Sequence, residues 1–133
     1  MEKMITSGKR KSAVARAVIK IGTGKITMNG RDYKTLQMFE RLRIEEPVRI
    51  AERILGKMNF DVEIIAKGGG QQGQTEASRL ALARAMVRFT NSKELKEAFV
   101  DYDRSLIVAD VRRKETYKPG DSKARRKRQK SYR

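Results

Sequence analysis

A glycine-rich segment is the part of the chain whose residue spacing most suggests chemistry. Its residues are Gly68, Gly69, Gly70, Gln71, Gln72 and Gly73, and they spell G-x-G-x-x-G between a predicted strand and a predicted helix. That setting is typical of a dinucleotide-binding turn. The acidic partner is missing, however, because Glu94 falls inside a predicted helix, and 133 residues are too few for two mononucleotide-binding halves and a substrate region. We therefore expect no dinucleotide cofactor.

The same segment also nearly matches a phosphate-binding loop, as G-x-x-x-x-G-x-T from Gly68 to Thr75. Gln74 stands where the lysine of such a loop must be, so no cation reaches the β- and γ-phosphates of a nucleotide. A glycine-rich turn that opens a helix still exposes backbone N–H groups to an anion. The sequence thus leaves two interpretations, a loop that receives a nucleic-acid phosphate and a turn without a ligand.

Other catalytic chemistry is limited by composition. The chain has no histidine and no cysteine, which excludes imidazole bases, thiol nucleophiles, zinc thiolate sites and disulfides. Asp101 and Asp103 flank Tyr102 and form a possible pair of catalytic carboxylates, but they lie beside Arg104 near a predicted helix end. That position favours helix caps and ion pairs over acid–base work. We expect no enzyme, no metal, no cofactor and no small-molecule substrate.

Positive charge dominates the chain and is concentrated at its end. The sequence holds 32 Lys and Arg against 16 Asp and Glu, and residues 112–133 contain eleven basic and two acidic residues. Nucleic acid is the commonest partner of such a chain. The competing partner, an anionic membrane, is disfavoured because the tail has no apolar face. No long apolar run or secretory signal occurs, so we expect a cytoplasmic protein.

Two clusters of cations are candidates for binding phosphate. Lys9, Arg10 and Lys11 precede a predicted strand, and Arg16 continues their charge onto it. A solvated run or a sorting signal is the alternative. The second cluster is the tail, where guanidinium groups match phosphate oxygens and Tyr132 can stack on a base. An import signal, a solubilising tail and a membrane anchor are its alternatives. Its cations from residue 123 onward are Lys123, Arg125, Arg126, Lys127, Arg128, Lys130 and Arg133.

The elements that must position these groups follow from hydrophobic periodicity. Period-two alternation predicts strands at 12–21, 25–29 and 60–67, the first two joined as a hairpin through Gly22-Thr23-Gly24. Helical spacing predicts a short stretch around residues 36–42, a helix that begins at Pro47 and ends at Gly56, a helix at 75–89, and a helix capped by Ser92. A short apolar run at 106–109 fits a buried strand. We expect an α/β or α+β domain at 1–111, with helices packed on a mixed sheet, and an extended tail at 112–133.

Three blocks of the sequence together resemble the universal small-subunit ribosomal protein 9 family. They are Gly8-Lys9-Arg10-Lys11-Ser12-Ala13-Val14-Ala15-Arg16-Ala17 with Asn29-Gly30-Arg31; the glycine segment followed by Ala77, Arg79 and Ala81-Leu82-Ala83-Arg84-Ala85; and Asp110-Val111-Arg112-Arg113-Lys114-Glu115 with Ala124-Arg125-Arg126 and Gln129-Lys130-Ser131-Tyr132-Arg133. The resemblance covers essentially the whole chain. The Lys-Ser-Tyr-Arg ending is similar to the archaeal and eukaryotic branch.

The resemblance implies a four-stranded mixed sheet with a left-handed βαβ crossover, in the head of the small ribosomal subunit in the cytoplasm. It also implies contacts with ribosomal RNA, with neighbouring head proteins and with the peptidyl-site tRNA. The residues it implies for tRNA are Arg133, Tyr132 and Lys130. Those it implies for ribosomal RNA are the first cluster above, the glycine segment, and the basic residues Arg112, Arg113, Lys114, Lys123, Arg125, Arg126, Lys127 and Arg128. Asp121, inside the Lys118-Pro119-Gly120-Asp121 stretch at the root of the tail, departs from an otherwise basic run. A free nucleic-acid chaperone and a small nucleotide-binding enzyme are the alternative functions.

Overall fold

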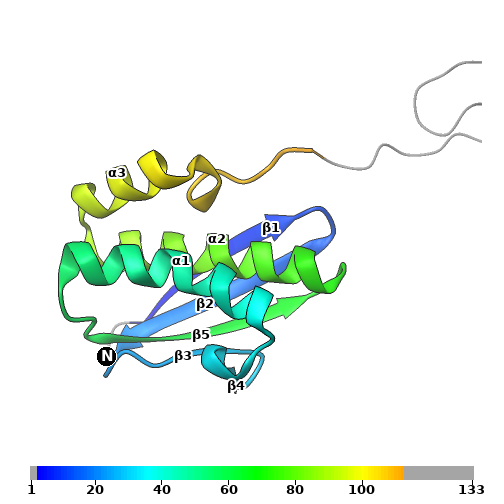
Figure 1. Cartoon of the computed structure of the whole chain (residues 1–133), viewed down its shortest axis with the longest axis horizontal. Helices are drawn as coiled ribbons and strands as arrows, with labels where there is room; N and C mark the ends of the chain where they lie inside the picture. Colours follow the sequence, from blue (N-terminus) through cyan, green and yellow to red (C-terminus); the bar gives the residue numbers. More distant parts are fainter. Residues whose placement is uncertain (1–2, 113–133) are drawn as a thin grey trace, which may run out of the picture.

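The structure, a computed structural model, describes residues 3–112 (Figure 1). Within them the chain forms five strands, three α-helices and two short 3₁₀-helices. In chain order these are β1 (Met4–Arg10), β2 (Ala13–Ile21), β3 (Ile26–Met28), β4 (Arg31–Asp32), η1 (Tyr33–Thr35), α1 (Met38–Leu55), β5 (Phe60–Lys67), α2 (Gln71–Thr90), α3 (Lys93–Tyr102) and η2 (Arg104–Leu106). The predicted tail beyond Arg112 lies outside the described residues, and the boundary between domain and tail stays a prediction.

The sheet is mixed, as expected, but has five strands where the family resemblance implied four. The strand order is β1-β2-β5-β3-β4, with β1–β2, β2–β5 and β3–β4 antiparallel and β3–β5 parallel. The parallel pair is connected through α1, which forms the expected βαβ crossover. Its left-handed sense stays a prediction.

The predicted hairpin between the strands at 12–21 and 25–29, which are β2 and β3, is wrong, because β5 lies between them. The segment that joins β2 to β3 passes over the start of β5. Asp61 Oδ1 accepts hydrogen bonds from the backbone N–H groups of Thr23, Gly24 and Lys25 at 2.9, 3.1 and 2.9 Å. These bonds hold the pKa of Asp61 below its usual value, that from Lys25 being the largest cause. A glycine-containing connection thus joins two strands that are not neighbours.

Two further strand assignments differ from the prediction. β1 was not expected, since its cations were placed before the first strand. The predicted strand at 106–109 is wrong, because Leu106 ends η2 and Val108 is 43% exposed. Asp103 starts η2 by accepting the N–H of Ser105 at 3.0 Å, so this short apolar run turns instead of extending. Such a run cannot be assigned from periodicity alone.

A single helix, α1, replaces the two predicted helices around 36–42 and 47–56. Pro47 was expected at a helix start but lies in the middle of α1. A proline in a helix interior costs about 3 kcal/mol. Tertiary packing outweighs that cost, because Ile44, Val48 and Ala51 are at most 2% exposed and form one face of the helix against the core.

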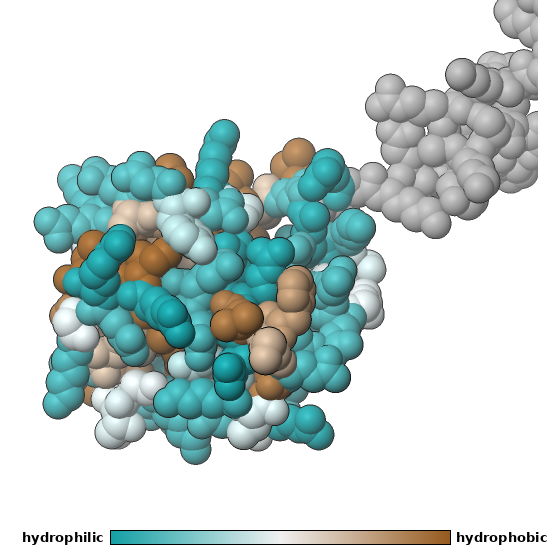
Figure 2. Space-filling view, in the orientation of Figure 1, coloured by the Kyte–Doolittle hydropathy of each residue, from teal (hydrophilic) through white to brown (hydrophobic). Residues whose placement is uncertain are grey.

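The helices cover one face of the sheet (Figure 1). α2 packs on β1, β2 and β5, while α1 lies against α2 and α3. The strand at 60–67, the charge-free arc of the helix predicted at 75–89 and the Ser92 cap of α3 are confirmed. Along β2 and β5, successive residues alternate between a face buried under the helices and an open face. On the open face, Val14 and Ile65 are 39% and 45% exposed. The face shown in Figure 2 is mostly hydrophilic, with small separate hydrophobic areas.

Candidate nucleic-acid interface

Two sequence blocks that lie about fifty residues apart meet at one end of the sheet. β1 and β2 are joined by a turn at residues 11–12, and the glycine segment follows β5, which pairs with β2. A Cβ atom added to Gly68 would lie 2.7 Å from the carbonyl oxygen of Ser12, and one added to Gly69 would lie 3.1 Å from the Cβ of Ala13. The predicted anion-binding loop and the predicted basic run therefore form one surface.

Glycine is required in this loop by its backbone conformation as well as by the close approach. Gly68 and Gly69 have φ angles of +77° and +61°, in the left-handed region that other residues rarely adopt. Gly70 is the N-cap of α2 and provides no side-chain cap. The first backbone bond of α2 runs from Gln74 N–H to the Gly70 carbonyl at 2.9 Å. The N–H groups of the three residues between them are left to donate hydrogen bonds to an anion.

Exposed lysines surround this loop. Lys9 on β1, Val14 on β2 and Lys67 on β5 stand in one cross-strand row on the open face of the sheet. Lys9, Lys11 and Lys67 are all exposed and have no carboxylate partner within the described residues. Arg16 is also exposed on the open face, one row further from the loop, opposite Ile65. The end of the sheet thus combines uncompensated cations with backbone donors.

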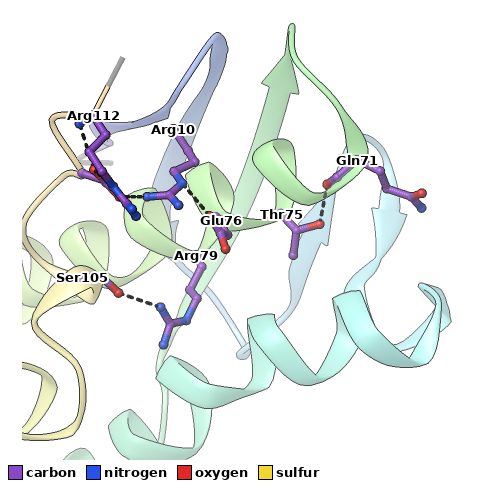
Figure 3. Close-up of polar contacts among 8 residues, drawn as sticks. Arg10, Gln71, Thr75, Glu76, Arg79, Ser105 and Arg112 are labelled. Carbon is purple, nitrogen blue, oxygen red and sulfur yellow. Dashed lines mark hydrogen bonds and ion pairs between the residues drawn. The ribbon is translucent and has the colours of Figure 1, made fainter. Parts of the chain in front are cut away.

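Arg10 differs from its neighbours, because two carboxylates already compensate its charge. Its Nε lies 2.8 Å from Oε2 of Glu76, and its Nη1 bonds Oδ2 of Asp110 (Figure 3). Arg112 joins the same cluster, with Nη2 at 2.7 Å from Asp110 Oδ2. Hydrogen bonds from Arg112, and then from Arg10, hold the pKa of Asp110 well below its usual value. The cluster fastens the last described residues of the chain to β1 and α2.

Sequence reasoning missed the role of Arg79, which is only 5% exposed. Its Nη2 lies 2.6 Å from Glu46 Oε2 and 3.2 Å from Asp103 Oδ2. Its Nη1 donates to Ser105 Oγ at 3.3 Å (Figure 3). It therefore ties α2 to α1 and to the start of η2. The prediction that Asp103 serves in a cap and an ion pair is confirmed. The signal in the sequence was that Arg79 is the only charged residue within the otherwise uncharged stretch at 77–83.

An exposed aromatic side chain near the loop was also missed. Phe39 of α1 is 57% exposed, and the guanidinium of Arg43 lies 5.4 Å from the centre of its ring. Both line a small hollow together with Gln72 and Thr75 of the first turns of α2. An exposed ring beside anion-binding donors offers a stacking surface for a nucleotide base. The sequence did not reveal this exposure, because the position of Phe39 in α1 fits the apolar face of an ordinary amphipathic helix.

The remaining predicted site residues lie outside the described residues. They are Arg113, Lys114, Lys123, Arg125, Arg126, Lys127, Arg128, Lys130, Tyr132 and Arg133. Within residues 3–112, no three acidic side chains are grouped so that they could hold a metal ion. No helix in the same range is long and apolar enough to cross a membrane.

Comparisons with known proteins agree along the whole chain. The family model described as ribosomal protein S9/S16 matches residues 8–133. The small ribosomal subunit protein uS9 of Thermoplasma volcanium is 52% identical over 135 aligned positions, which cover all of both chains. The proteins of the same name from Methanococcus vannielii and Methanococcus maripaludis are 43% and 46% identical, again over the full length of both chains.

Proposed function

The chain belongs to the ribosomal protein S9/S16 family, and we propose that it binds small-subunit ribosomal RNA through the loop end of its sheet and contacts peptidyl-site tRNA through its tail. It is a protein of the small ribosomal subunit, cytoplasmic and not an enzyme, like its uS9 relatives. The RNA that it binds is the ribosomal RNA of that subunit, and the proteins that it contacts are its neighbours in the subunit head.

One observation carries the proposal for ribosomal RNA, namely the meeting of the β1–β2 turn with the glycine loop. The free N–H groups at the start of α2 suit one phosphate. The same loop is surrounded by three exposed lysines, Lys9, Lys11 and Lys67. Their charges can bind the phosphates that precede and follow the first one along the RNA backbone. Phe39 stands nearby to receive an exposed base. Phosphate contacts of this kind position a protein on folded RNA without reading much sequence.

The test compares two pairs of exposed lysines and arginines. Lys9→Gln with Lys11→Gln removes two charges at the loop, while Arg53→Gln with Lys57→Gln removes two charges beyond the other end of β5. Binding to a small-subunit head RNA fragment is measured by filter retention between about 50 and 200 mM salt. A plot of the logarithm of the association constant against the logarithm of the salt concentration has a negative slope. The first pair should make that slope less steep by about 1–2, and the second pair should leave it unchanged. Equal slopes for both variants would contradict the proposed interface.

The backbone donors are tested separately with Gly70→Ala. Gly70 has an ordinary φ of −98°, and no atom lies within 4 Å of an added Cβ, so the fold accommodates it. The new methyl group stands at the N-cap and obstructs the approach of a phosphate to the N–H groups of α2. Affinity for the RNA fragment should fall roughly tenfold while the thermal melt stays within a few degrees. Unchanged affinity would show that the loop is a turn without a ligand.

For the tail we propose that Lys123, Arg125, Arg126, Lys127 and Arg128 contact ribosomal RNA and that Lys130, Tyr132 and Arg133 reach the tRNA. Support comes from the density of cations after residue 122 and from the family to which the chain belongs. Small subunits reconstituted with a chain ending at Ser122 should sediment normally but retain peptidyl-site tRNA less well. Deletion of Arg133 alone should weaken tRNA retention without affecting assembly. Normal tRNA retention by both variants would refute the proposed contact.

Sucrose-gradient sedimentation of the tagged full chain tests the ribosomal assignment in cells. The chain should travel with small subunits through moderate salt. A free nucleic-acid chaperone would remain at the top of the gradient, and that result would refute a stable place in the subunit.

A further inference from the structure

The outer edge of β1 forms the wall of a groove remote from the glycine loop. β1 is the first strand in the sheet order, so one of its sides has no strand partner among the described residues. A hollow of about 580 Å³ lies along that side, between β1, the C-terminal half of α2 and the start of α3. Its polar and charged lining residues include Arg84, Arg88, Lys93 and Lys96, and no carboxylate is among its lining residues.

The backbone of β1 is available for pairing along this edge. In an antiparallel pair, alternate residues turn both backbone groups toward the partner strand or both away from it. The carbonyl of Ser7 accepts a hydrogen bond from Arg84 Nη1 at 3.0 Å, which places Ser7 among the outward-facing residues. Ile5 and Lys9 share that direction by alternation. Three N–H donors therefore point out of the sheet, and open edges of this length are normally covered in proteins.

Arg84 gives the groove a fixed positive group. Its Nε donates to the Ile107 carbonyl at 3.0 Å and its Nη1 to the Ser7 carbonyl, so the guanidinium is held between β1 and the segment after η2. Both acceptors are neutral, and no carboxylate within the described residues pairs with it. The charge is thus positioned but uncompensated. Arg88, Lys93 and Lys96 are exposed around the same opening.

We propose that this groove binds an extended acidic segment of another protein chain, which adds to the sheet as a strand beside β1. An added strand satisfies the outward N–H groups of β1, and its acidic side chains meet Arg84 and the surrounding cations. Val87 and Ile107, both half-buried, supply an apolar floor for alternate side chains. A row of backbone donors above an apolar floor fits a polypeptide better than a nucleic-acid backbone. The added strand would share only Lys9 with the proposed RNA interface, through the backbone N–H and not the exposed side chain. The proposal does not rest on that interface.

The test uses the full chain and a defined probe, an eight-residue peptide of alternating glutamate and valine with blocked ends. Amide hydrogen exchange is followed residue by residue by NMR, because a local readout is not affected by binding of the acidic peptide to the basic tail. At a peptide concentration about ten times its Kd, exchange at Ile5, Ser7 and Lys9 should slow about tenfold. The same peptide with two valines replaced by proline should give no such protection, because proline cannot pair as a strand.

Matched variants assign the binding to the groove. Arg88→Gln with Lys96→Gln changes two exposed side chains that have no ion-pair or hydrogen-bond partner within residues 3–112. This double variant should raise the Kd of the peptide, measured from the protection of β1, roughly 3- to 30-fold. Arg53→Gln with Lys57→Gln, which removes the same charge outside the groove, should leave it unchanged. Absence of protection at β1, equal protection by the proline peptide, or equal effects of both variants would overturn the proposal. So would protection of β1 by an eight-nucleotide uridine RNA in place of the peptide, since the groove would then be a phosphate site.

Discussion

Gly8 is the position where a single methyl group should do most damage to the fold. A Cβ added there would lie 2.3 Å from the carbonyl oxygen of Ala77 and 2.8 Å from the nitrogen of Ala81, both in the backbone of α2. Backbone atoms of a helix cannot rotate away, so β1 would have to move outward by about 1 Å. That movement would also stretch the bond from Thr6 Oγ1 to the Ala81 carbonyl, now 2.8 Å long.

The magnitude follows from these two losses. Overpacking of this kind costs about 1–3 kcal/mol, and a weakened buried hydrogen bond costs about 1 kcal/mol. Replacing glycine in a strand returns up to about 1 kcal/mol by reducing the entropy of the unfolded chain. We expect Gly8→Ala to lower the free energy of unfolding by about 1–4 kcal/mol.

Urea unfolding followed by circular dichroism measures this loss, and Ser7→Ala is the matched control. Ser7 is the neighbouring residue on β1, its side chain is exposed, and its alanine variant should unfold within about 0.5 kcal/mol of the parent chain. Equal stability of Gly8→Ala and Ser7→Ala would refute the argument that β1 and α2 are in backbone contact at this glycine.

Three further predictions concern side chains that fasten elements together. Arg79→Met should cost about 2–4 kcal/mol in urea unfolding, because it leaves Glu46 and Asp103 without their cation; a loss below about 0.5 kcal/mol would contradict the role of Arg79. Ser92→Ala should cost about 1 kcal/mol, since the Ser92 hydroxyl accepts the Leu95 N–H at 3.2 Å; Ser92→Asp, which keeps an acceptor, should restore it. The pKa of Asp110 is lowered in the folded chain, so its pairing stabilises fully above the unfolded pKa of about 4 and is lost as pH falls below that value. Thermal melts between pH 6 and pH 3 should therefore fall more steeply for the parent chain than for Asp110→Asn, and parallel profiles would contradict this.

Local sequence patterns predicted the elements that keep one regular buried face along their whole length. Strict alternation in β2 and β5 indicated half-buried strands, and the charge-free arc of α2 indicated a helix packed on them. The failures occurred where tertiary contacts outweigh local preference. Pro47 is a strong local signal for a helix start, yet the core contacts of α1 carry the helix through it.

The candidate site was predicted in its residue types but not in its arrangement. The glycine segment and the basic run were both identified, whereas their contact depends on the antiparallel pairing of β2 with β5. The distinct states of the three consecutive cations were also not predictable. Lys9 and Lys11 are exposed, but Arg10 is engaged by Glu76 and Asp110, which come from 66 and 100 residues further along the chain.

The sequence by itself determined the charge of the chain, the absence of thiol and imidazole chemistry, the periodicity of the main elements and the likeness to a ribosomal family, because these depend on residue types and short spacings. Only the tertiary structure decided which strands are neighbours, which cations stay free and which edge of the sheet is open. Those features depend on pairing between distant segments, where burial of apolar faces and satisfaction of backbone groups are settled for the whole domain at once.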